Sequence, residues 1–299
     1  MNHIAADFRR WEIPGIAAFT DGPGGLVRID LTTSSSQAQV YLHGAHVASF
    51  QPADAQPVLF LSKLSQFAED KPIRGGVPVI FPWFGPRAGH PDSPSHGFAR
   101  TLPWELESLT SADDASVDLV LVLESNDATR AEWPHDFTLR HSISAGPELT
   151  MVLEVTNRSD GPFTFEEALH TYFTISDIHD VIVTGFEGAE YLDKVDAARR
   201  KTQDRAPIRI TGETDRLYLN TRTTCVVEDP GMSRRIIVEK SGSDSTVLWN
   251  PWSAKAARLT DLGDEWPGMI CIETVNAAEN SVTLEPGAKH AMRATVRLG

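Results

Sequence analysis

The chain has 299 residues, of which 41% are hydrophobic and 23% charged, a composition typical of soluble globular proteins and unlike disordered or collagen-like chains. Its formal net charge of −14 makes nucleic acids and anionic membranes poor partners. A few converging Arg and Lys side chains can still bind a small anionic molecule through charge-assisted hydrogen bonds.

The cysteine content and the hydropathy pattern indicate an intracellular compartment. Cys225 and Cys271 are the two cysteines, which are too few for a disulfide framework and match no zinc-ligand spacing. The first 15 residues contain no apolar stretch of the kind a secretory signal requires, and no segment reaches the roughly 18 to 20 apolar residues of a membrane helix. We therefore expect a cytoplasmic monomer that does not associate with membranes.

Strands dominate the predicted elements. Short apolar runs or period-two alternation predict strands, in chain order, at residues 39–42, 117–123, 149–155, 181–183, 225–228, 236–239, 247–250, 282–284 and 294–298. Gly and Pro mark turns at 21–25, 159–162 and 285–287. Helical signals are few: residues 193–201 can form two turns, and Ser253 can cap a helix over 254–262. We predict an all-β antiparallel sandwich in a single domain, residues 1–299.

Motifs for several common chemistries are missing. The sequence has no GxGxxG after a strand, no GxxxxGK[ST], no HExxH, no EF-hand loop and no GxSxG, so dedicated nucleotide and metal sites lose support. His43 and His46 are separated by Gly and Ala with no carboxylate or cysteine nearby, and we interpret them as structural histidines. We expect neither a metal nor a cofactor.

Residues 71–85 form the most unusual segment, because they join two cations to paired glycines and an apolar run. Prolines stiffen this backbone, and Gly75-Gly76 permits close approach of a ligand or of another strand. Arg74 would then be held at a fixed place, as recognition of a phosphate or of sugar hydroxyls requires. The alternative is a proline-rich loop that packs on the core and leaves Lys71 and Arg74 in solvent.

Three further segments carry candidate polar groups. Residues 95–100 place Ser95, His96 and Arg100 close together. Strand alternation over 166–173 puts His170 on one face with Ala168 and Tyr172, where it either transfers protons in a cleft or is a hydrogen-bonded core histidine.

Glu273 stands out in the apolar strand predicted over residues 269–277. A carboxylate in such a run is either functional or salt-bridged, and burial raises its pKa toward that of an effective general base. The tryptophans Trp83, Trp249, Trp252 and Trp266 supply either a stacking platform for a sugar ring or, more commonly, core packing.

The chain resembles the hexose-6-phosphate mutarotase branch of the aldose 1-epimerase superfamily in five pieces taken in order: KPIRGGVPVIFPWFGP (71–86), HGFAR (96–100), ALHTYF (168–173), TDRLY (214–218) and Glu273. The resemblance spans most of the chain. It implies a galactose-mutarotase-like antiparallel β-supersandwich with few short helices, in which a concave face holds the active site. It also implies an isomerase that needs no metal or cofactor.

The same resemblance implies roles for individual residues. His170 is similar to the general acid of the family and Glu273 to its general base. Arg74 and Arg100 are similar to the cations that hold the phosphorylated sugar, and Asp215 is similar to a carboxylate that binds a sugar hydroxyl.

Three more residues follow from the resemblance as substrate contacts. Lys71 and His96 are plausible additional contacts. Many relatives carry Gln directly before HGFAR, where this chain has Ser95, so one hydrogen bond to a sugar hydroxyl is lost or replaced through a water.

The implied reaction interconverts the α and β anomers of an aldohexose 6-phosphate, such as glucose 6-phosphate. Two alternatives stay open from the sequence. One is an aldose 1-epimerase for unphosphorylated sugars, which needs no converging Arg pair. The other is a non-catalytic sugar-binding module, against which the presence of both His170 and Glu273 counts.

Overall fold

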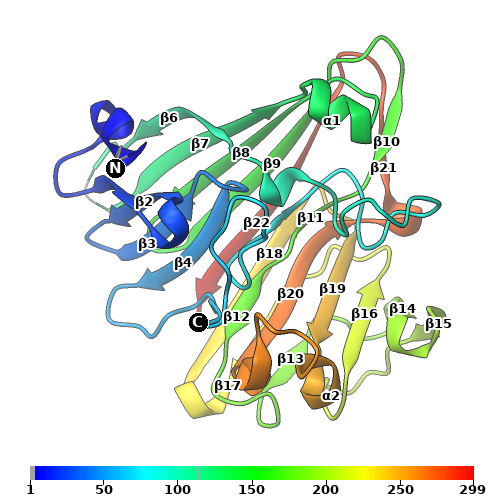
Figure 1. The fold of residues 1–299 in the computed structure, drawn as a ribbon. Helices are drawn as coiled ribbons and strands as arrows, with labels where there is room; N and C mark the ends of the chain where they lie inside the picture. Colours follow the sequence, from blue (N-terminus) through cyan, green and yellow to red (C-terminus); the bar gives the residue numbers. More distant parts are fainter. Residues whose placement is uncertain (1–3, 114) are drawn as a thin grey trace.

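The structure is a computed structural model and describes residues 4–113 and 115–299 (Figure 1). Its strands form three main sheets in which all pairs are antiparallel. A separate two-stranded ribbon joins β10 (Phe163–Phe165) to β21 (Val282–Leu284). The predicted all-β antiparallel fold with few short helices is confirmed.

The three sheets are numbered here for reference. Sheet 1 has the order β1 (Ala17–Asp21), β2 (Val27–Thr32), β3 (Ser36–Tyr41), β4 (His46–Pro52). Sheet 2 has the order β13 (Ile182–Thr184), β17 (Cys225–Asp229), β18 (Arg234–Ser241), β22 (Lys289–Leu298), β9 (Leu149–Asn157), β8 (Phe137–Ala145), β7 (Val117–Glu124), β6 (Glu105–Thr110). Sheet 3 has the order β15 (Arg199–Thr202), β14 (Glu190–Asp193), β16 (Thr214–Tyr218), β19 (Ser245–Asn250), β20 (Met269–Asn276), β11 (Glu167–Leu169), β5 (Val79–Ile80), and β12 (Tyr172–Thr174) also pairs with β20.

Helices in the described residues are short. The α-helices are α1 (Asp127–Glu132) and α2 (Trp252–Ala256). The 3₁₀ helices are η1 (Ile4–Trp11), η2 (Pro23–Gly25), η3 (Ala99–Thr101), η4 (Lys194–Asp196), η5 (Pro230–Met232), η6 (Gly263–Gly268) and η7 (Ala278–Asn280). Among the residues that the structure describes, no helix combines the length and the apolar character needed to cross a bilayer.

Sheet 2 packs against both other sheets, and one large apolar cluster fills the space between them. Side chains of sheet 1, such as Phe50, and of sheet 2, such as Leu121, belong to this cluster together with Ile270 and Ile272 of β20. In Figure 1 the strands of sheet 1 (blue) lie over the β6–β9 part of sheet 2. The burial of both layers explains the alternating strands found in the sequence.

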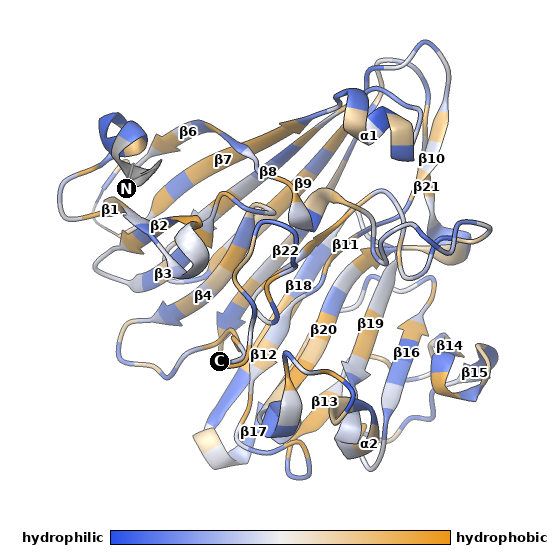
Figure 2. Ribbon diagram, viewed as in Figure 1, coloured by the Kyte–Doolittle hydropathy of each residue, from blue (hydrophilic) through white to orange (hydrophobic). Residues whose placement is uncertain are grey.

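Strand β20 is buried on both faces, which decides where the site lies. Ile270 and Ile272 face sheet 2, whereas Met269, Cys271 and Val275 belong to a second apolar cluster on the opposite face. Figure 2 shows the hydrophobic stretches of β19 and β20. Because side chains alternate along a strand, Glu273 shares the face of Cys271 and points away from sheet 2.

Both helix predictions need correction. Residues 193–201 do not form a helix: they contain the end of β14, the single turn η4 and most of β15. The Asp193 side chain accepts a hydrogen bond from the Val195 N–H, and Ala197 takes a left-handed φ of 52°, so the chain turns back as a hairpin.

The second helix is displaced from its prediction. It begins at Trp252 and ends at Ala256, so Ser253 lies inside α2 and does not cap it. The side-chain oxygen of Asn250 instead accepts the Trp252 N–H at 2.9 Å. The predicted helical residues after Ala256 form turns that lead into η6.

Candidate active site

A cavity of about 220 Å³ lies on the face of sheet 3 that points away from sheet 2. Five of the eight predicted site residues line it: Arg74, His96, His170, Asp215 and Glu273. They come from a loop before β5, the loop before η3, the link between β11 and β12, and strands β16 and β20. Segments far apart in the chain thus meet at one place.

His170 and Glu273 are in direct contact. The His170 Nε2 atom lies 3.3 Å from the Glu273 Oε1 atom. Glu273 occupies the centre of β20 opposite Val247 of β19, and its side chain is 1% exposed. His170 follows β11, and its backbone N–H donates to the Pro78 carbonyl oxygen. Strand β20 therefore holds Glu273, and the end of the neighbouring strand β11 holds His170.

Burial shifts both members of the pair toward their neutral forms. It raises the pKa of Glu273 well above its ordinary value, an effect that Lys194 opposes and Asp215 reinforces. Burial also lowers the pKa of His170 well below 6.5, helped by His96, Arg100 and Arg74. The pair therefore keeps one proton between its two members over a wide pH range.

Two polar atoms of the pair have no hydrogen-bond partner in the described part of the protein. The Glu273 Oε2 and His170 Nδ1 atoms are buried and have no hydrogen-bond partner among the described residues. Buried polar atoms normally have a partner, and active sites are a recognised exception. One carboxylate oxygen and one ring nitrogen of a cavity-lining pair are thus left without a protein partner.

Arg74 is held firmly on the same cavity wall. Its Nε and Nη2 atoms lie 3.1 and 3.0 Å from Asp261 Oδ2, and its Nη1 donates to the Tyr172 hydroxyl at 2.9 Å. Gly75 has φ +110°, and a Cβ there would lie 2.4 Å from the Phe60 carbonyl oxygen. The paired glycines therefore serve the close approach of another segment, and this packing fixes the backbone of Arg74.

The three predicted site residues of the segment 95–100, which are Ser95, His96 and Arg100, have different surroundings. His96 has φ +66°, and its Nδ1 accepts the Gly85 N–H at 3.3 Å, which leaves the proton on Nε2. Burial, aided by nearby cations, lowers the pKa of His96 to about 3, so the ring is neutral. Arg100 donates from Nη2 to the Ser95 carbonyl at 2.7 Å.

Arg100 and Ser95 lie behind the cavity wall. Neither is among the residues that line the cavity, although Arg100 is close enough to act electrostatically on His170 and Arg74. Burial lowers the pKa of Arg100 to about 10, so its guanidinium is charged at neutral pH. Ser95 is exposed, and its main-chain carbonyl makes the contact with Arg100.

Asp215 faces the cavity from β16. Burial raises its pKa, while Lys194 and Lys255 act in the opposite direction. The Lys255 Nζ atom lies 3.8 Å from Asp215 and 2.9 Å from Glu213. The neighbouring carboxylate of Asp193 instead pairs with Lys201 at 2.7 Å on the hairpin.

Sequence reasoning missed the cations Lys194 and Lys255. Lys194 lines the cavity with its Nζ 4.4 Å from the centre of the Phe84 ring, and Lys255 comes from α2. The approach of Lys194 depends on the turn at η4, which lies in the segment predicted as a helix. The sequence could have indicated Lys255, because it is a basic residue three positions after Trp252 in the tryptophan-containing segment that begins at Trp249.

Lys71 lies outside the cavity. Its side chain is 52% exposed and pairs with Asp70 at 3.6 Å, while its carbonyl oxygen contacts the His43 Nε2 atom at 2.8 Å. Burial lowers the pKa values of His43 and His46, so these two rings are neutral members of the packing. The structural interpretation of both histidines agrees with these surroundings.

His170, Cys271 and Glu273 present potential metal-ligand atoms within 4.8 Å of one another. Burial, followed by the charge of Glu273, raises the pKa of the Cys271 thiol well above its ordinary value, so the thiol keeps its proton. Three cations, Arg74, Lys194 and Lys255, line the same cavity and oppose a divalent ion. We therefore assign no metal to this cluster.

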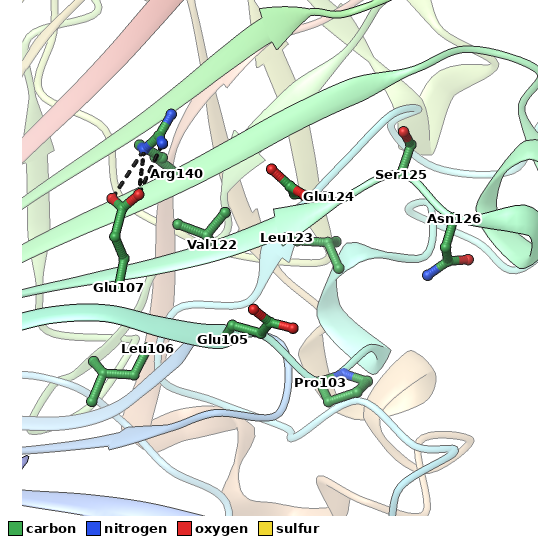
Figure 3. Close-up of a pocket in the computed structure, with 10 residues that line it drawn as sticks. All are labelled: Pro103, Glu105, Leu106, Glu107, Val122, Leu123, Glu124, Ser125, Asn126 and Arg140. Atoms are coloured by element: carbon green, nitrogen blue, oxygen red, sulfur yellow. Dashed lines mark hydrogen bonds and ion pairs between the residues drawn. The ribbon is translucent and has the colours of Figure 1, made fainter. Parts of the chain in front are cut away.

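A larger hollow of about 550 Å³ lies over β6, β7 and β8 (Figure 3). Its charged side chains are Glu105, Glu107, Glu124 and Arg140, and Arg140 binds Glu107 through Nε and Nη2 at 2.8 to 3.2 Å. None of the predicted site residues lines it. The smaller cavity is the candidate active site because it holds the buried His170–Glu273 contact, whose two groups have strongly shifted pKa values.

A sequence model of the aldose 1-epimerase family matches residues 27–297. The chain belongs to the aldose 1-epimerase family. The matched residues include every strand that lines the cavity, together with His170 and Glu273.

Relatives with a more specific name are similar over most of their length. A protein of Escherichia coli K12 with the provisional name glucose-6-phosphate 1-epimerase is 39% identical over 254 residues, covering 84% of each chain. One of Cenchrus ciliaris with the same provisional name is 35% identical over 277 residues, covering 89% of this chain and 82% of that protein.

A solved structure supports the same placement within the aldose 1-epimerase family. The crystal structure of a Salmonella typhimurium protein provisionally named a mutarotase has a TM-score of 0.89 and 33% identity. The match covers 96% of this chain and 95% of that one. The predicted galactose-mutarotase-like fold is therefore confirmed.

Proposed function

We propose that this protein interconverts the α and β anomers of an aldohexose 6-phosphate, with glucose 6-phosphate as the first candidate. The observation that carries the proposal is the buried His170–Glu273 contact in a cavity that Arg74 also lines. The provisional names of the relatives from Escherichia coli and Cenchrus ciliaris point to the same substrate.

The proposed mechanism uses the pair for two coupled proton transfers. When the shared proton of the pair is on His170, the Glu273 carboxylate takes the proton of the C1 hydroxyl while His170 protonates the ring oxygen, and the ring opens to the free aldehyde. Rotation about the C1–C2 bond presents the other carbonyl face. Ring closure then runs both transfers backwards, with Glu273 as the acid and His170 as the base. One proton on the pair is enough for the whole cycle.

The charges around the pair support an orientation for the sugar. Arg74 and Arg100 act on His170, whereas Lys194 and Asp215 act on Glu273. In an aldohexopyranose the ring oxygen is bonded to C5, which carries the C6 phosphate, and the C1 hydroxyl lies on the other side of that oxygen. A ring oxygen at His170 therefore brings the phosphate toward Arg74 and Arg100.

The remaining residues take secondary roles in the proposal. Asp215 accepts a hydrogen bond from a sugar hydroxyl near the Glu273 side, and His96 donates from Nε2. Ser95 acts through its carbonyl by holding Arg100. Lys71 is left out because it lies outside the cavity.

Magnetisation-transfer NMR at C1 tests the function directly. The α-to-β exchange of glucose 6-phosphate is followed with and without protein, and glucose is run in parallel. Acceleration of the phosphorylated sugar alone supports both the acid–base pair and the Arg site. Acceleration of both sugars identifies a general aldose 1-epimerase, and acceleration of neither leaves a sugar-binding module.

The wider assignments stay predictions. Cys225 and Cys271 are both unpaired and buried, which is compatible with the expected reducing, cytoplasmic compartment. Cell fractionation checks the location. Sedimentation equilibrium checks the monomeric state, and a single cooperative unfolding transition checks the one-domain organisation over residues 1–299.

A further inference from the structure

The orientation of the His170 imidazole is not set by the usual second hydrogen bond. Histidines that transfer protons or bind metals are commonly oriented by a hydrogen bond at the other ring nitrogen. Here Nε2 meets Glu273, while Nδ1 has no hydrogen-bond partner outside His170 itself among the described residues. A single contact at one nitrogen leaves the plane of the ring free to rotate, so another feature must hold it.

Aromatic rings surround the imidazole and supply that restraint. The Tyr172 ring lies parallel to it, with centroids 4.8 Å apart and an interplanar angle of 12°. Trp249 and His96 meet it nearly edge-on, at 6.0 Å and 81° and at 5.7 Å and 72°. Tyr172 is therefore the ring whose face defines the plane of His170.

Tyr172 is itself fixed at its other end. The residue is 2% exposed, and its hydroxyl oxygen accepts the hydrogen bond from Arg74 Nη1 at 2.9 Å. Asp261 holds the remaining side of that guanidinium. Three N–H groups of Arg74 are thus engaged, and two of its five remain for a ligand.

We propose that Tyr172 is a positioning residue with two separable parts, in which the ring orients the acid His170 and the hydroxyl orients the phosphate-binding Arg74. This inference rests on the proposed function. It makes the first residue of β12 responsible for the alignment of both halves of the site. Tyr172 itself also lines the cavity, so both of its parts act from within the site.

Two substitutions separate the parts. Tyr172→Phe keeps the stacked ring and removes the acceptor for Arg74, so KM for glucose 6-phosphate rises about 2- to 10-fold while kcat stays within about twofold. Tyr172→Leu removes the ring, so kcat falls about 10- to 100-fold.

Tyr218 provides the matched control. It is buried on β16 of the same sheet, stacks on Phe186 at 4.1 Å and 18°, and donates its hydroxyl to Gln203 at 2.8 Å. It does not line the cavity. Tyr218→Leu therefore lowers the stability of sheet 3 by removing a buried, stacked Tyr, and it leaves the surroundings of His170 unchanged.

The experiment measures kcat and KM by magnetisation-transfer NMR at a temperature well below the unfolding midpoint of every variant. Tyr172→Met is included as a second non-aromatic variant of similar volume in case Tyr172→Leu does not fold. The inference is supported if Tyr172→Phe and Tyr218→Leu have a kcat close to that of wild type, whereas Tyr172→Leu and Tyr172→Met have a much lower kcat.

Three results overturn the inference. They are a kcat within threefold of wild type for both non-aromatic variants, a kcat for Tyr172→Phe as low as for Tyr172→Leu, or an equal kcat loss in Tyr218→Leu. Failure of the proposed function looks different, because the wild-type protein itself then accelerates neither sugar.

Discussion

Glu273→Gln separates the activity of the site from its stability. The substitution keeps the size of a side chain that is 1% exposed and removes its ability to take a proton. A positioned general base contributes roughly 10²- to 10⁴-fold to the rate, which corresponds to about 2.7 to 5.4 kcal/mol in the barrier. We expect the exchange rate of glucose 6-phosphate to fall by that factor.

The same variant should lose activity without losing stability at pH 7. Burial raises the pKa of Glu273 in the folded protein above the value near 4.3 expected in the unfolded chain. Above that unfolded pKa, folding must therefore disfavour the ionised carboxyl, and this cost grows until the pH passes the folded pKa. Gln carries no such cost. Its unfolding midpoint should equal or exceed that of wild type at pH 7, and the gap should close as the pH falls toward 4.

Urea unfolding at pH 7 and at pH 4, together with the NMR exchange assay, checks both statements. Glu273→Asp is the control that keeps the carboxyl group and shortens its reach. A loss of less than tenfold in Glu273→Gln refutes the assignment of the base. A large loss of activity accompanied by a lower unfolding midpoint at pH 7 refutes the argument from burial.

Three further predictions use the same assays. Arg100→Ala removes a cation that acts on the site without lining the cavity, so kcat/KM for glucose 6-phosphate should fall by less than about 10-fold; a loss of about 100-fold or more would instead indicate a direct charge-assisted hydrogen bond from Arg100 to the phosphate. The pH profile of kcat/KM should be a broad plateau, because burial moves the histidine limb well below 6.5 and the carboxyl limb well above its usual range; a narrow bell around pH 5.5 would contradict the one-proton pair. Gly97→Ala should cost about 4 kcal/mol or more, because its Cβ would lie 1.9 Å from the Phe81 carbonyl oxygen, whereas Gly85→Ala, also at positive φ but with open space, should cost about 1 to 2 kcal/mol in urea unfolding.

The strands and the acid–base pair were within reach of the sequence. Alternation predicted the strand over residues 149–155, which lies within β9, whereas the strand predicted over 166–173 is interrupted at His170 and Thr171, between β11 and β12. In the structure Ala168 and Tyr172 belong to the same apolar cluster, and His170 stacks on Tyr172. Glu273 stood out because a carboxylate interrupts an apolar strand. These are local signals, and the resemblance to a family joined them into one site.

The positions of the cations in the site could not be predicted from local sequence patterns. Lys71 and Arg74 are three residues apart in one motif, but only Arg74 turns inward, because Asp261 and Tyr172 hold its guanidinium. Both partners are far from Arg74 in the chain. Lys194 reaches the cavity through a hairpin whose turn depends on pairing between β14 and β15. Contacts of this kind are set by sheet topology, which composition and spacing do not encode.

The opposed pKa shifts of the pair suit a reaction whose two halves exchange roles. In water a Glu near 4.3 and a His near 6.5 leave a shared proton mainly on the histidine, so one direction of transfer would be favoured. Burial raises the pKa of Glu273 and lowers that of His170, which shifts the shared proton away from the histidine and toward the carboxyl group. Each group must serve once as acid and once as base during anomer exchange, and proton transfer in both directions is fastest when neither position is strongly preferred. The apolar floor beneath the cavity, built by Val247, Trp249 and Cys271, is therefore part of the chemistry as well as of the core.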